Sequence, residues 1–230
     1  TLRELDLRNE IKGAEELAGI KESLADQFNM DLLRFPIYYP ELSNADILVS
    51  EFVDGMSLEE GIEEKALTWD FLLQFFRIHG AYLFGIGTFH GDLHPGNCIV
   101  DPNGKFVFID NGAICHAPKK VAHALFHFFD HLSRQEMQQA FDALLAMTEV
   151  NPTPKKLAKY YATMTEIYTD FEKKPVGEQS LTRIMMKTVK AAVEHAGANF
   201  GEEAFPIIRA LMYLDGLVIR THPDALLIQS

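Results

Sequence analysis

A loop rich in glycine and proline near the middle of the chain is the feature that most constrains its fold. Residues 90–97 read HGDLHPGN, and a hydrophobic stretch after a tight turn at 102–104 leads to Asp110. Glycine and proline require a compact backbone path here, and the turn predicts a hairpin of two short strands. Because a hairpin brings its two ends together, Asp92, Asn97 and Asp110 are expected to meet at one point.

The three side chains expected to meet there offer oxygen ligands and suit phosphoryl transfer. Asp92 can orient an attacking hydroxyl or accept its proton, and its spacing to Asn97 is that of a kinase catalytic loop. Asp110 and Asn97 can hold a divalent cation across the phosphates. Hard oxygen ligands favour Mg²⁺, which keeps several of its waters and needs few protein ligands. The loop therefore predicts a magnesium-dependent phosphoryl-transfer centre.

Two histidine-based alternatives compete with this interpretation. His90, Asp92 and His94 alternate and could share one face as metal ligands, but the following Pro-Gly ends any strand and no further ligand cluster follows. A second set recurs every four residues, so one face of a helix could chelate a transition metal. Phenylalanines surround this set, which favours an amphipathic helix with hydrogen-bonded histidines instead. Its members are His123, His127 and His131.

Charge and composition narrow the possible partners. The 230 residues carry a formal net charge of −12, so we expect no basic stripe that could neutralise a nucleic-acid backbone. The same charge argues against attachment to an anionic membrane, and no apolar run reaches transmembrane length. The charged opening residues lack the apolar stretch of a signal peptide. Cys98 and Cys115 are interpreted as small buried residues in a reducing compartment.

Hydrophobic periodicity indicates an α+β fold with a few strands near the front and a helical remainder. Residues 2–28 have helical spacing, 35–40 are extended, and 45–53 have the pattern of a buried strand. Ser57 and Glu60 predict a capping box at the start of a helix. Strands are expected at 97–100 and 105–109, and further helices at 69–84, 119–132, 134–147, 154–171, 180–196 and 202–220.

Several segments, taken in order, resemble the ABC1/ADCK/UbiB family of atypical kinases. The loop at 90–97 resembles the family's H-A-D-x-H-P-G-N motif, with Gly91 in place of alanine. Aminoglycoside and choline phosphotransferases have similar loops, but the start of this chain also resembles the family's E-x-D motif followed by the glutamate of helix αC. The segments that carry the resemblance are 4–10, 39–43 with 47–55, 90–97 and 210–217.

The resemblance implies an α+β, protein-kinase-like fold in two parts. Residues 1–53 would be a partial N-lobe with the E-x-D motif, helix αC and the strands up to the hinge, and residues 54–230 a helical C-lobe. It also implies a role for each matching residue. Asp92 would be the catalytic aspartate, Asn97 and Asp110 the Mg²⁺ ligands, Glu10 the partner of the ATP-binding lysine, Glu4 and Asp6 the E-x-D pair, Glu51 and Val53 backbone contacts to adenine, and Ser50 the gatekeeper.

The chain departs from the family's pattern in two places. The K-x-G-Q segment, the alanine-rich phosphate loop and the ATP-binding lysine lie upstream of E-x-D in the family, and this sequence starts at E-x-D. We therefore expect a piece of a longer protein, which binds nucleotide poorly by itself. In addition, Asn111 stands where the family's D-F-G motif has phenylalanine, which argues against conventional activation-loop switching.

The family resemblance implies an ATP- and Mg²⁺-dependent atypical kinase or ATPase that supports ubiquinone biosynthesis. Its partners would be nucleotide, lipid or isoprenoid intermediates and other ubiquinone-biosynthesis proteins. It would be cytoplasmic or peripheral to the inner membrane in a bacterium, or mitochondrial in a eukaryote. Two alternatives remain open at this point: a small-molecule phosphotransferase of the aminoglycoside or choline kinase type, and a catalytically weak pseudokinase scaffold.

Overall fold

The strands of the computed structural model are short and lie in the first half of the chain. The structure describes residues 6–171, 173–202 and 204–225. These residues form two compact units that divide between His116 and Ala117. The lobe boundary expected at residue 53 falls inside the first unit and stays a prediction. The described elements are therefore mixed α and β in the first unit and helical in the second, as the periodicity predicted.

Helix α1 (Arg8–Leu24) begins the described part of the first unit, as its spacing predicted. One face is buried because apolar or small residues recur every three or four positions, including Ile11, Ala14 and Leu17. The glycine of this face, Gly13, lies against the carbonyl oxygen of Asn111, and an added Cβ atom would overlap that oxygen. The missing side chain therefore lets α1 approach the segment that follows the hairpin.

The predicted hairpin forms the centre of a four-stranded sheet with strand order β1-β5-β4-β2. Strands β4 (Cys98–Val100) and β5 (Phe106–Phe108) pair antiparallel, with Ile99 opposite Val107. Strand β1 (Leu33–Arg34) joins β5 in parallel, and β2 (Met56–Ser57) joins β4 antiparallel. Sequence alone predicted the hairpin but neither of the two short outer strands.

The helices of the first unit lead into the glycine-rich loop. Ser57 and Glu60 form the predicted capping box at the start of α2 (Leu58–Glu63). The long apolar helix is α3 (Trp69–Gly80), which continues as a π-helical turn η2 (Ala81–Ile86) and ends at Gly87, whose φ is 86°. Glycine adopts this left-handed conformation without strain. The chain then enters β3 (Thr88–His90), which pairs antiparallel with β6 (Ile114–His116).

The prediction of a strand over residues 45–53 is wrong. Backbone pairing there is limited to one bridge between Tyr38 and Ser50, beside a short 3₁₀ turn η1 (Pro40–Leu42). The side chains of Ile47 and Phe52 are 54% and 90% exposed. A run of apolar residues becomes a buried strand only when neighbouring strands cover it, and the described residues provide no ladder beyond that bridge.

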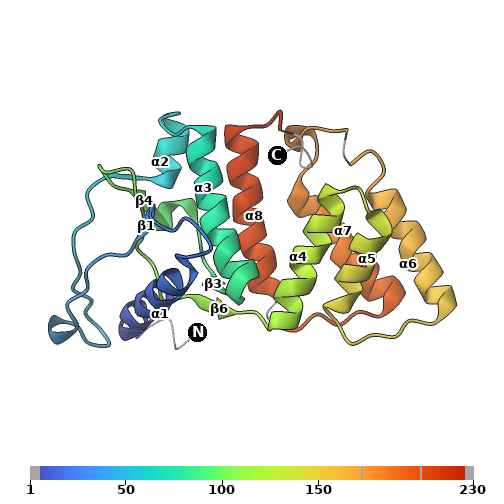
Figure 1. Ribbon diagram of the computed structural model, residues 1–230, viewed down its shortest axis with the longest axis horizontal. Helices are drawn as coiled ribbons and strands as arrows, with labels where there is room; N and C mark the ends of the chain where they lie inside the picture. Colours follow the sequence, from blue (N-terminus) through green and yellow to red (C-terminus); the bar gives the residue numbers. More distant parts are fainter. Residues whose placement is uncertain (1–5, 172, 203, 226–230) are drawn as a thin grey trace. The chain divides into compact units, whose positions relative to one another are not determined.

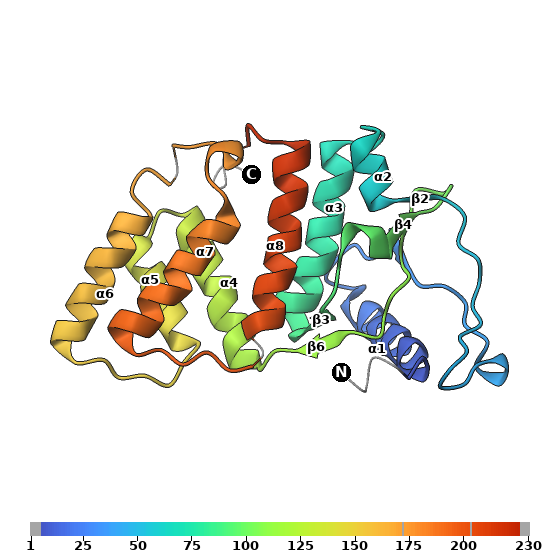
Figure 2. The ribbon, with the colours of Figure 1, turned by 180° about the vertical axis from the view of Figure 1, so that it is seen from behind.

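The second unit is an assembly of helices. Figures 1 and 2 show α4, α5, α6 and α7 side by side, and neighbours in this series pack on one another. The five helices predicted beyond residue 118 are confirmed, with ends that move by a few residues. They are α4 (Lys119–Ser133), α5 (Met137–Ala146), α6 (Pro154–Ile167), α7 (Leu181–Ala191) with its π turn η5 (Ala192–Ala196), and α8 (Ala204–Thr221), with a 3₁₀ turn η4 (Val176–Glu178) before α7.

A buried aspartate on α8 caps the start of α7. Asp215 accepts hydrogen bonds from the backbone nitrogens of Leu181 and Thr182 at 3.2 and 2.9 Å, and from the Thr182 hydroxyl at 2.7 Å. A carboxylate at a helix N-terminus satisfies amides that have no partner within the helix and complements the helix dipole. The late helix that resembles the family segment is thereby fixed to its neighbour.

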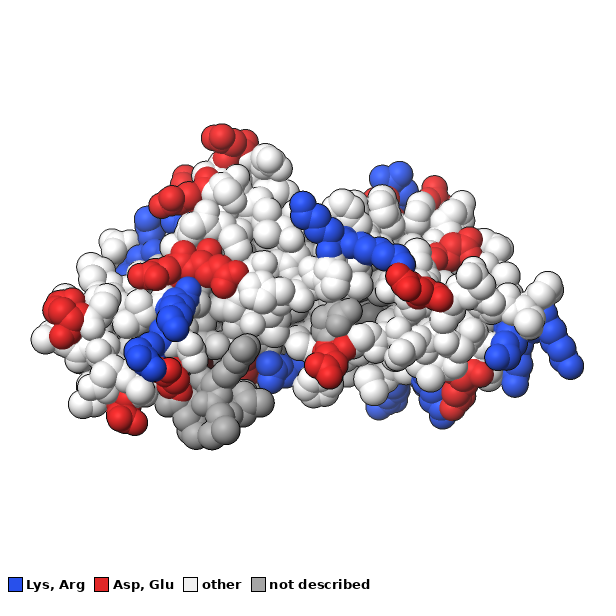
Figure 3. Space-filling view, turned by 90° about the horizontal axis from the view of Figure 1, so that it is seen from below, with Lys and Arg blue, Asp and Glu red and all other residues white. Residues whose placement is uncertain are grey.

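The surface of the protein carries charged side chains of both signs. On the face in Figure 3, Lys and Arg side chains are interspersed with Asp and Glu. No helix within the described ranges is both long enough and apolar enough to cross a membrane.

Candidate active site

The glycine-rich loop between β3 and β4 is held in shape by its own histidines. His90 is buried at the end of β3, and its Nδ1 accepts a hydrogen bond from the Asp92 backbone nitrogen at 3.2 Å. The Nδ1 of His94 accepts one from the Gly96 nitrogen at 3.0 Å, as the chain enters the turn η3 (Pro95–Asn97). These two rings hold the backbone of the loop, and among the described residues no three His, Cys, Asp or Glu side chains are placed to hold a metal ion together.

Asn97 joins the two aspartates that sequence placed at one point. Its Nδ2 donates to the backbone oxygen of Asp92 at 3.1 Å and to the Asp110 Oδ2 at 3.3 Å. The backbone nitrogen of Ile109 donates to the backbone oxygen of Asn97 at 3.1 Å, which connects the end of β5 to the loop. All three side chains are partly exposed. The hairpin therefore brings the three residues together as predicted, and their chemical roles stay predictions.

Glu10 on α1 reaches the same place from a distant part of the sequence. Its Oε2 accepts a hydrogen bond from the Asn111 backbone nitrogen at 2.6 Å. Burial raises the pKa of Glu10, hydrogen bonds from the amides of Asn111 and Gly112 oppose the rise, and the neighbouring Asp110 carboxylate adds to it. An added Cβ atom on Gly112 would overlap the Glu10 carboxylate. Glu10, the residue predicted to match the αC glutamate, thus contacts the backbone of the segment that carries Asp110.

Asn111 is fully buried beside this carboxylate. Its Nδ2 donates to the Phe108 carbonyl oxygen at 2.8 Å and to the Tyr38 hydroxyl at 3.1 Å. Burial raises the pKa of Tyr38, so the hydroxyl stays protonated near neutral pH. Sequence reasoning noticed the asparagine but missed Tyr38, because no motif relates two residues so far apart in the chain.

The residues predicted to form the hinge and the E-x-D pair have other bonding partners than Asp92, Asn97 and Asp110. The Glu51 carboxylate accepts from Arg34 at 3.1 Å and from the Ile37 nitrogen at 3.0 Å, and these bonds lower the pKa of Glu51, the one from Ile37 most. Val53 is buried. Asp6 pairs with Arg8 at 2.7 Å, which lowers the pKa of Asp6 to about 2. Glu4, the other member of the pair, lies outside the described residues.

The ABC1 atypical kinase-like domain matches residues 1–144, more than half of the chain. The chain belongs to this family. The family membership agrees with the segments that carried the resemblance, of which the E-x-D element and the glycine-rich loop lie within the matched residues.

Individual relatives are distant. The chain is 24% identical over 226 residues to the Arabidopsis thaliana protein Activity of bc1 complex kinase 3, chloroplastic, covering 94% of this chain and 30% of that protein. It is 25% identical over 240 residues to a probable protein kinase UbiB of Histophilus somni, covering 97% and 41%. The chain thus spans less than half the length of these relatives.

A solved structure has the same fold. The Mycobacterium tuberculosis protein Rv3197, determined in complex with erythromycin, matches with a TM-score of 0.53 at 17% identity. The match covers 99% of this chain and 60% of that one. At this identity the likeness establishes a kinase-like fold alone, which agrees with the α+β, kinase-like expectation at that level.

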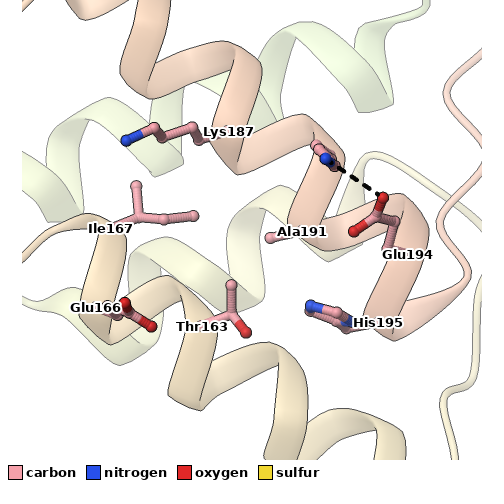
Figure 4. A pocket seen from close by; sticks show the side chains of 8 residues that line it. Thr163, Glu166, Ile167, Lys187, Ala191, Glu194 and His195 are labelled. Carbon is pink, nitrogen blue, oxygen red and sulfur yellow. Dashed lines mark ion pairs between the residues drawn. The ribbon is translucent and has the colours of Figure 1, made fainter.

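The helical unit contains a hollow of about 350 Å³ between α6 and α7 with its π turn. In Figure 4, Thr163 and His195 come to it from facing helices, and Lys190 pairs with Glu194 at 3.7 Å. The charges of its lining therefore compensate one another in part. The lining residues are Thr163, Glu166, Ile167, Lys187, Lys190, Ala191, Glu194 and His195.

The structure also shows the surroundings of the α4 histidines and of the two cysteines. On α4, His127 stacks on His131 at 6.1 Å, and His131 Nδ1 lies 2.6 Å from a carboxylate oxygen of Glu136. The opposite face of α4 is buried through Leu125 and Phe128. The prediction of an amphipathic helix is confirmed, and His131 has the hydrogen bond expected of these histidines. Cys98 is buried as expected, whereas Cys115 is only partly buried, and neither cysteine forms a disulfide.

Proposed function

We propose that this chain is the metal-binding and catalytic part of an ATP- and Mg²⁺-dependent atypical kinase or ATPase. The observation that carries the proposal is the Asn97 side chain, whose amide nitrogen bonds both the Asp92 backbone and the Asp110 carboxylate. A phosphoryl-transfer site needs a base or orienting carboxylate and a metal-binding carboxylate close together. Membership of an atypical kinase family supports the same chemistry.

The residues present suit a hard cation. Asp110 offers carboxylate oxygens, and because Asn97 uses its amide nitrogen for hydrogen bonds, its amide oxygen remains as a ligand. When bound, Mg²⁺ would neutralise charge on the phosphates. Asp92 would orient the attacking hydroxyl or water and accept its proton. Glu10 would hold the Asp110 segment in place, and backbone groups at Glu51 and Val53 would contact adenine.

A role in ubiquinone biosynthesis is the cellular function we favour. Support comes from relatives named as probable UbiB protein kinases, although the chain is only 25% identical to one of them. The partners would then be isoprenoid or lipid intermediates and other proteins of that synthesis. Such a protein would work in the cytoplasm or at the inner membrane of a bacterium, or in a mitochondrion. The plant relative named as chloroplastic makes a plastid a further possibility.

Substitution of the two aspartates in the full-length protein tests the proposal. We expect Asp110→Asn to abolish the Mg²⁺ dependence of ATP binding, and Asp92→Asn to preserve binding while reducing ATP turnover by roughly 100-fold or more. Isothermal titration calorimetry and a phosphate-release assay measure the two effects. Asp31→Asn, at an exposed position, serves as the matched control. Unchanged binding and turnover in both variants would contradict the proposal.

A pseudokinase scaffold is the second candidate, favoured by Asn111 in place of phenylalanine and by the engagement of Glu10 with the loop backbone. A native-state ligand must raise thermal stability by mass action. If millimolar ATP with Mg²⁺ leaves the melting temperature of the full-length protein unchanged, the scaffold is the better description.

A further inference from the structure

The segment after β5 is held at residue 111 from three parts of the first unit. The Asn111 backbone nitrogen donates to Glu10 of α1 at 2.6 Å, and its side-chain Nδ2 donates to the Phe108 carbonyl oxygen at 2.8 Å and to the Tyr38 hydroxyl at 3.1 Å. Asp110 lies between the two bonded positions 108 and 111. The backbone that presents the candidate metal-binding carboxylate is therefore fixed on both sides.

Packing alone does not account for an asparagine here. The side chain is fully buried, and its Oδ1 has no hydrogen-bond partner among the residues that the structure describes. A buried polar atom without a partner costs roughly 1–3 kcal/mol, whereas an apolar side chain of the same shape can be neutral or stabilising. A leucine of similar volume would remove that cost, but it would also take away the hydrogen bonds that Asn111 donates to the Phe108 carbonyl oxygen and the Tyr38 hydroxyl. The place of this side chain is therefore set by its two hydrogen bonds and not by packing alone.

Tyr38 connects this point to the hinge segment. It forms the backbone bridge with Ser50, and the nitrogens of Tyr39 and Glu51 donate to the oxygens of Val49 and Ile37 at 3.0 and 2.7 Å. Glu51, one of the two residues proposed to contact adenine, thus shares a backbone pairing with the segment of the tyrosine whose hydroxyl binds Asn111. The bond between Tyr38 and Asn111 joins this pairing to the segment that carries Asp110.

We propose that Asn111 is a positioning residue that, through Tyr38, sets the orientation in which Asp110 holds a divalent cation. This inference rests on the proposed function, because it assumes that Asp110 binds Mg²⁺. The Asn111–Tyr38 bond supplies by hydrogen bonding the constraint that an apolar residue supplies by packing in a D-F-G segment. Because Tyr38 belongs to the hinge pairing, cation binding at Asp110 and nucleotide binding at the hinge are coupled through this bond.

Mg²⁺ affinity, measured in the full-length protein with saturating ATP, tests the inference. Asn111→Leu removes both side-chain bonds while keeping the volume, and Tyr38→Phe removes one hydroxyl oxygen. We expect each to weaken the apparent Mg²⁺ affinity by roughly 10-fold, as loss of a group that orients a metal ligand does. The double variant should be no weaker than Asn111→Leu alone, since both act through one bond. Tyr39→Phe, on the neighbouring tyrosine, is the control and should bind as the unmodified protein does.

Thermal melts in the absence of metal separate positioning from stability. We expect Tyr38→Phe, which keeps the ring and the bond from Asn111 to Phe108, to melt close to the temperature of the unmodified protein while its Mg²⁺ affinity falls. A lowered melting temperature with unchanged Mg²⁺ affinity would show a structural role and overturn the inference. Additive losses in the double variant would also overturn it. If Asn111→Leu does not fold, Tyr38→Phe still tests the inference: weaker Mg²⁺ affinity supports it, and unchanged affinity overturns it.

The same titration separates the inference from the proposed function. If the unmodified protein binds ATP without any dependence on Mg²⁺, the proposed function fails, and the positioning role fails with it. If the unmodified protein binds Mg²⁺ and both variants bind it equally well, the function stands and only the role of Asn111 is lost.

Discussion

At the scale of single residues, His79 gives the stability of the first unit a pH dependence. The ring is buried on α3 next to Phe89, and its Nε2 has no hydrogen-bond partner within the described residues. Burial, with a smaller contribution from the charge of His90, lowers the pKa of His79 from 6.5 to about 3. The unfolded chain therefore binds a proton in this range that the folded chain excludes.

We predict that stability is lost as the pH falls below about 6.5. The contribution from His79 is fully present above that pH, and by pH 5 the free energy of unfolding should drop by roughly 2 kcal/mol. His79→Leu should remove this part of the slope, whereas His123→Leu, at an exposed site, should leave it. Urea denaturation at pH 7 and pH 5 measures the difference. Equal slopes for His79→Leu and the unmodified chain would contradict the prediction.

Gly91 is a second position where a single residue is expected to change the free energy of unfolding. The family's loop has alanine here, but an added Cβ atom would overlap the Cys115 Sγ and lie 2.8 Å from the Ala113 carbonyl oxygen. We predict that Gly91→Ala lowers the free energy of unfolding by about 1–3 kcal/mol. Adding Cys115→Ala should restore part of the loss, because the sulfur goes while the carbonyl remains. Denaturant melts of both single variants and the double variant measure the recovery, and no recovery would refute the role of the sulfur.

Residue-level reasoning from sequence reached the site only where neighbours in the chain define it. Asp92, Asn97 and Asp110 could be placed because a turn and two short strands connect them. Tyr38 could not, since its bond to Asn111 depends on how two distant segments pack. Nothing local in either segment encodes that contact.

At the scale of elements, α1 offers two glycines with opposite surroundings. An added Cβ atom on Gly13 would overlap the Asn111 carbonyl oxygen, whereas one on Gly19 would meet nothing within 4 Å. We predict that Gly13→Ala destabilises the chain by about 1–3 kcal/mol, while Gly19→Ala stabilises it by about 0.5–1 kcal/mol. Circular dichroism during urea titration compares the two. Similar effects of both substitutions would mean that the contact between Gly13 and the Asn111 carbonyl oxygen does not limit the packing of α1.

Element prediction succeeded where the signal was local and failed where it was not. The capping box at Ser57 and the hairpin turn at 102–104 are short patterns with a physical cause, and both formed as predicted. The run at 45–53 has the composition of a strand, but composition says nothing about whether other strands lie beside it. The segment is exposed because no strand among the described residues covers it, although its own residues suit a strand.

At the scale of the whole molecule, net charge limits the partners. With a formal charge of −12, the chain should repel polyanions. We predict no retention on immobilised heparin at about 50 mM salt, and no shift of duplex DNA in a native gel, because phosphate binding requires clustered basic side chains. Salt-sensitive retention would contradict this and would indicate a local basic surface.

The exposed apolar side chains between residues 37 and 52 also affect how the protein can be handled. Ile37, Leu42, Ile47 and Phe52 are each more than half exposed, and they lie within one short segment. Folded proteins rarely expose several large apolar side chains so close in sequence, and environment-sensitive dyes bind to exposed apolar surface. Dye fluorescence from this chain would therefore be high before heating, which would mask the unfolding signal. Circular dichroism or intrinsic fluorescence is the sounder probe for every melt described above.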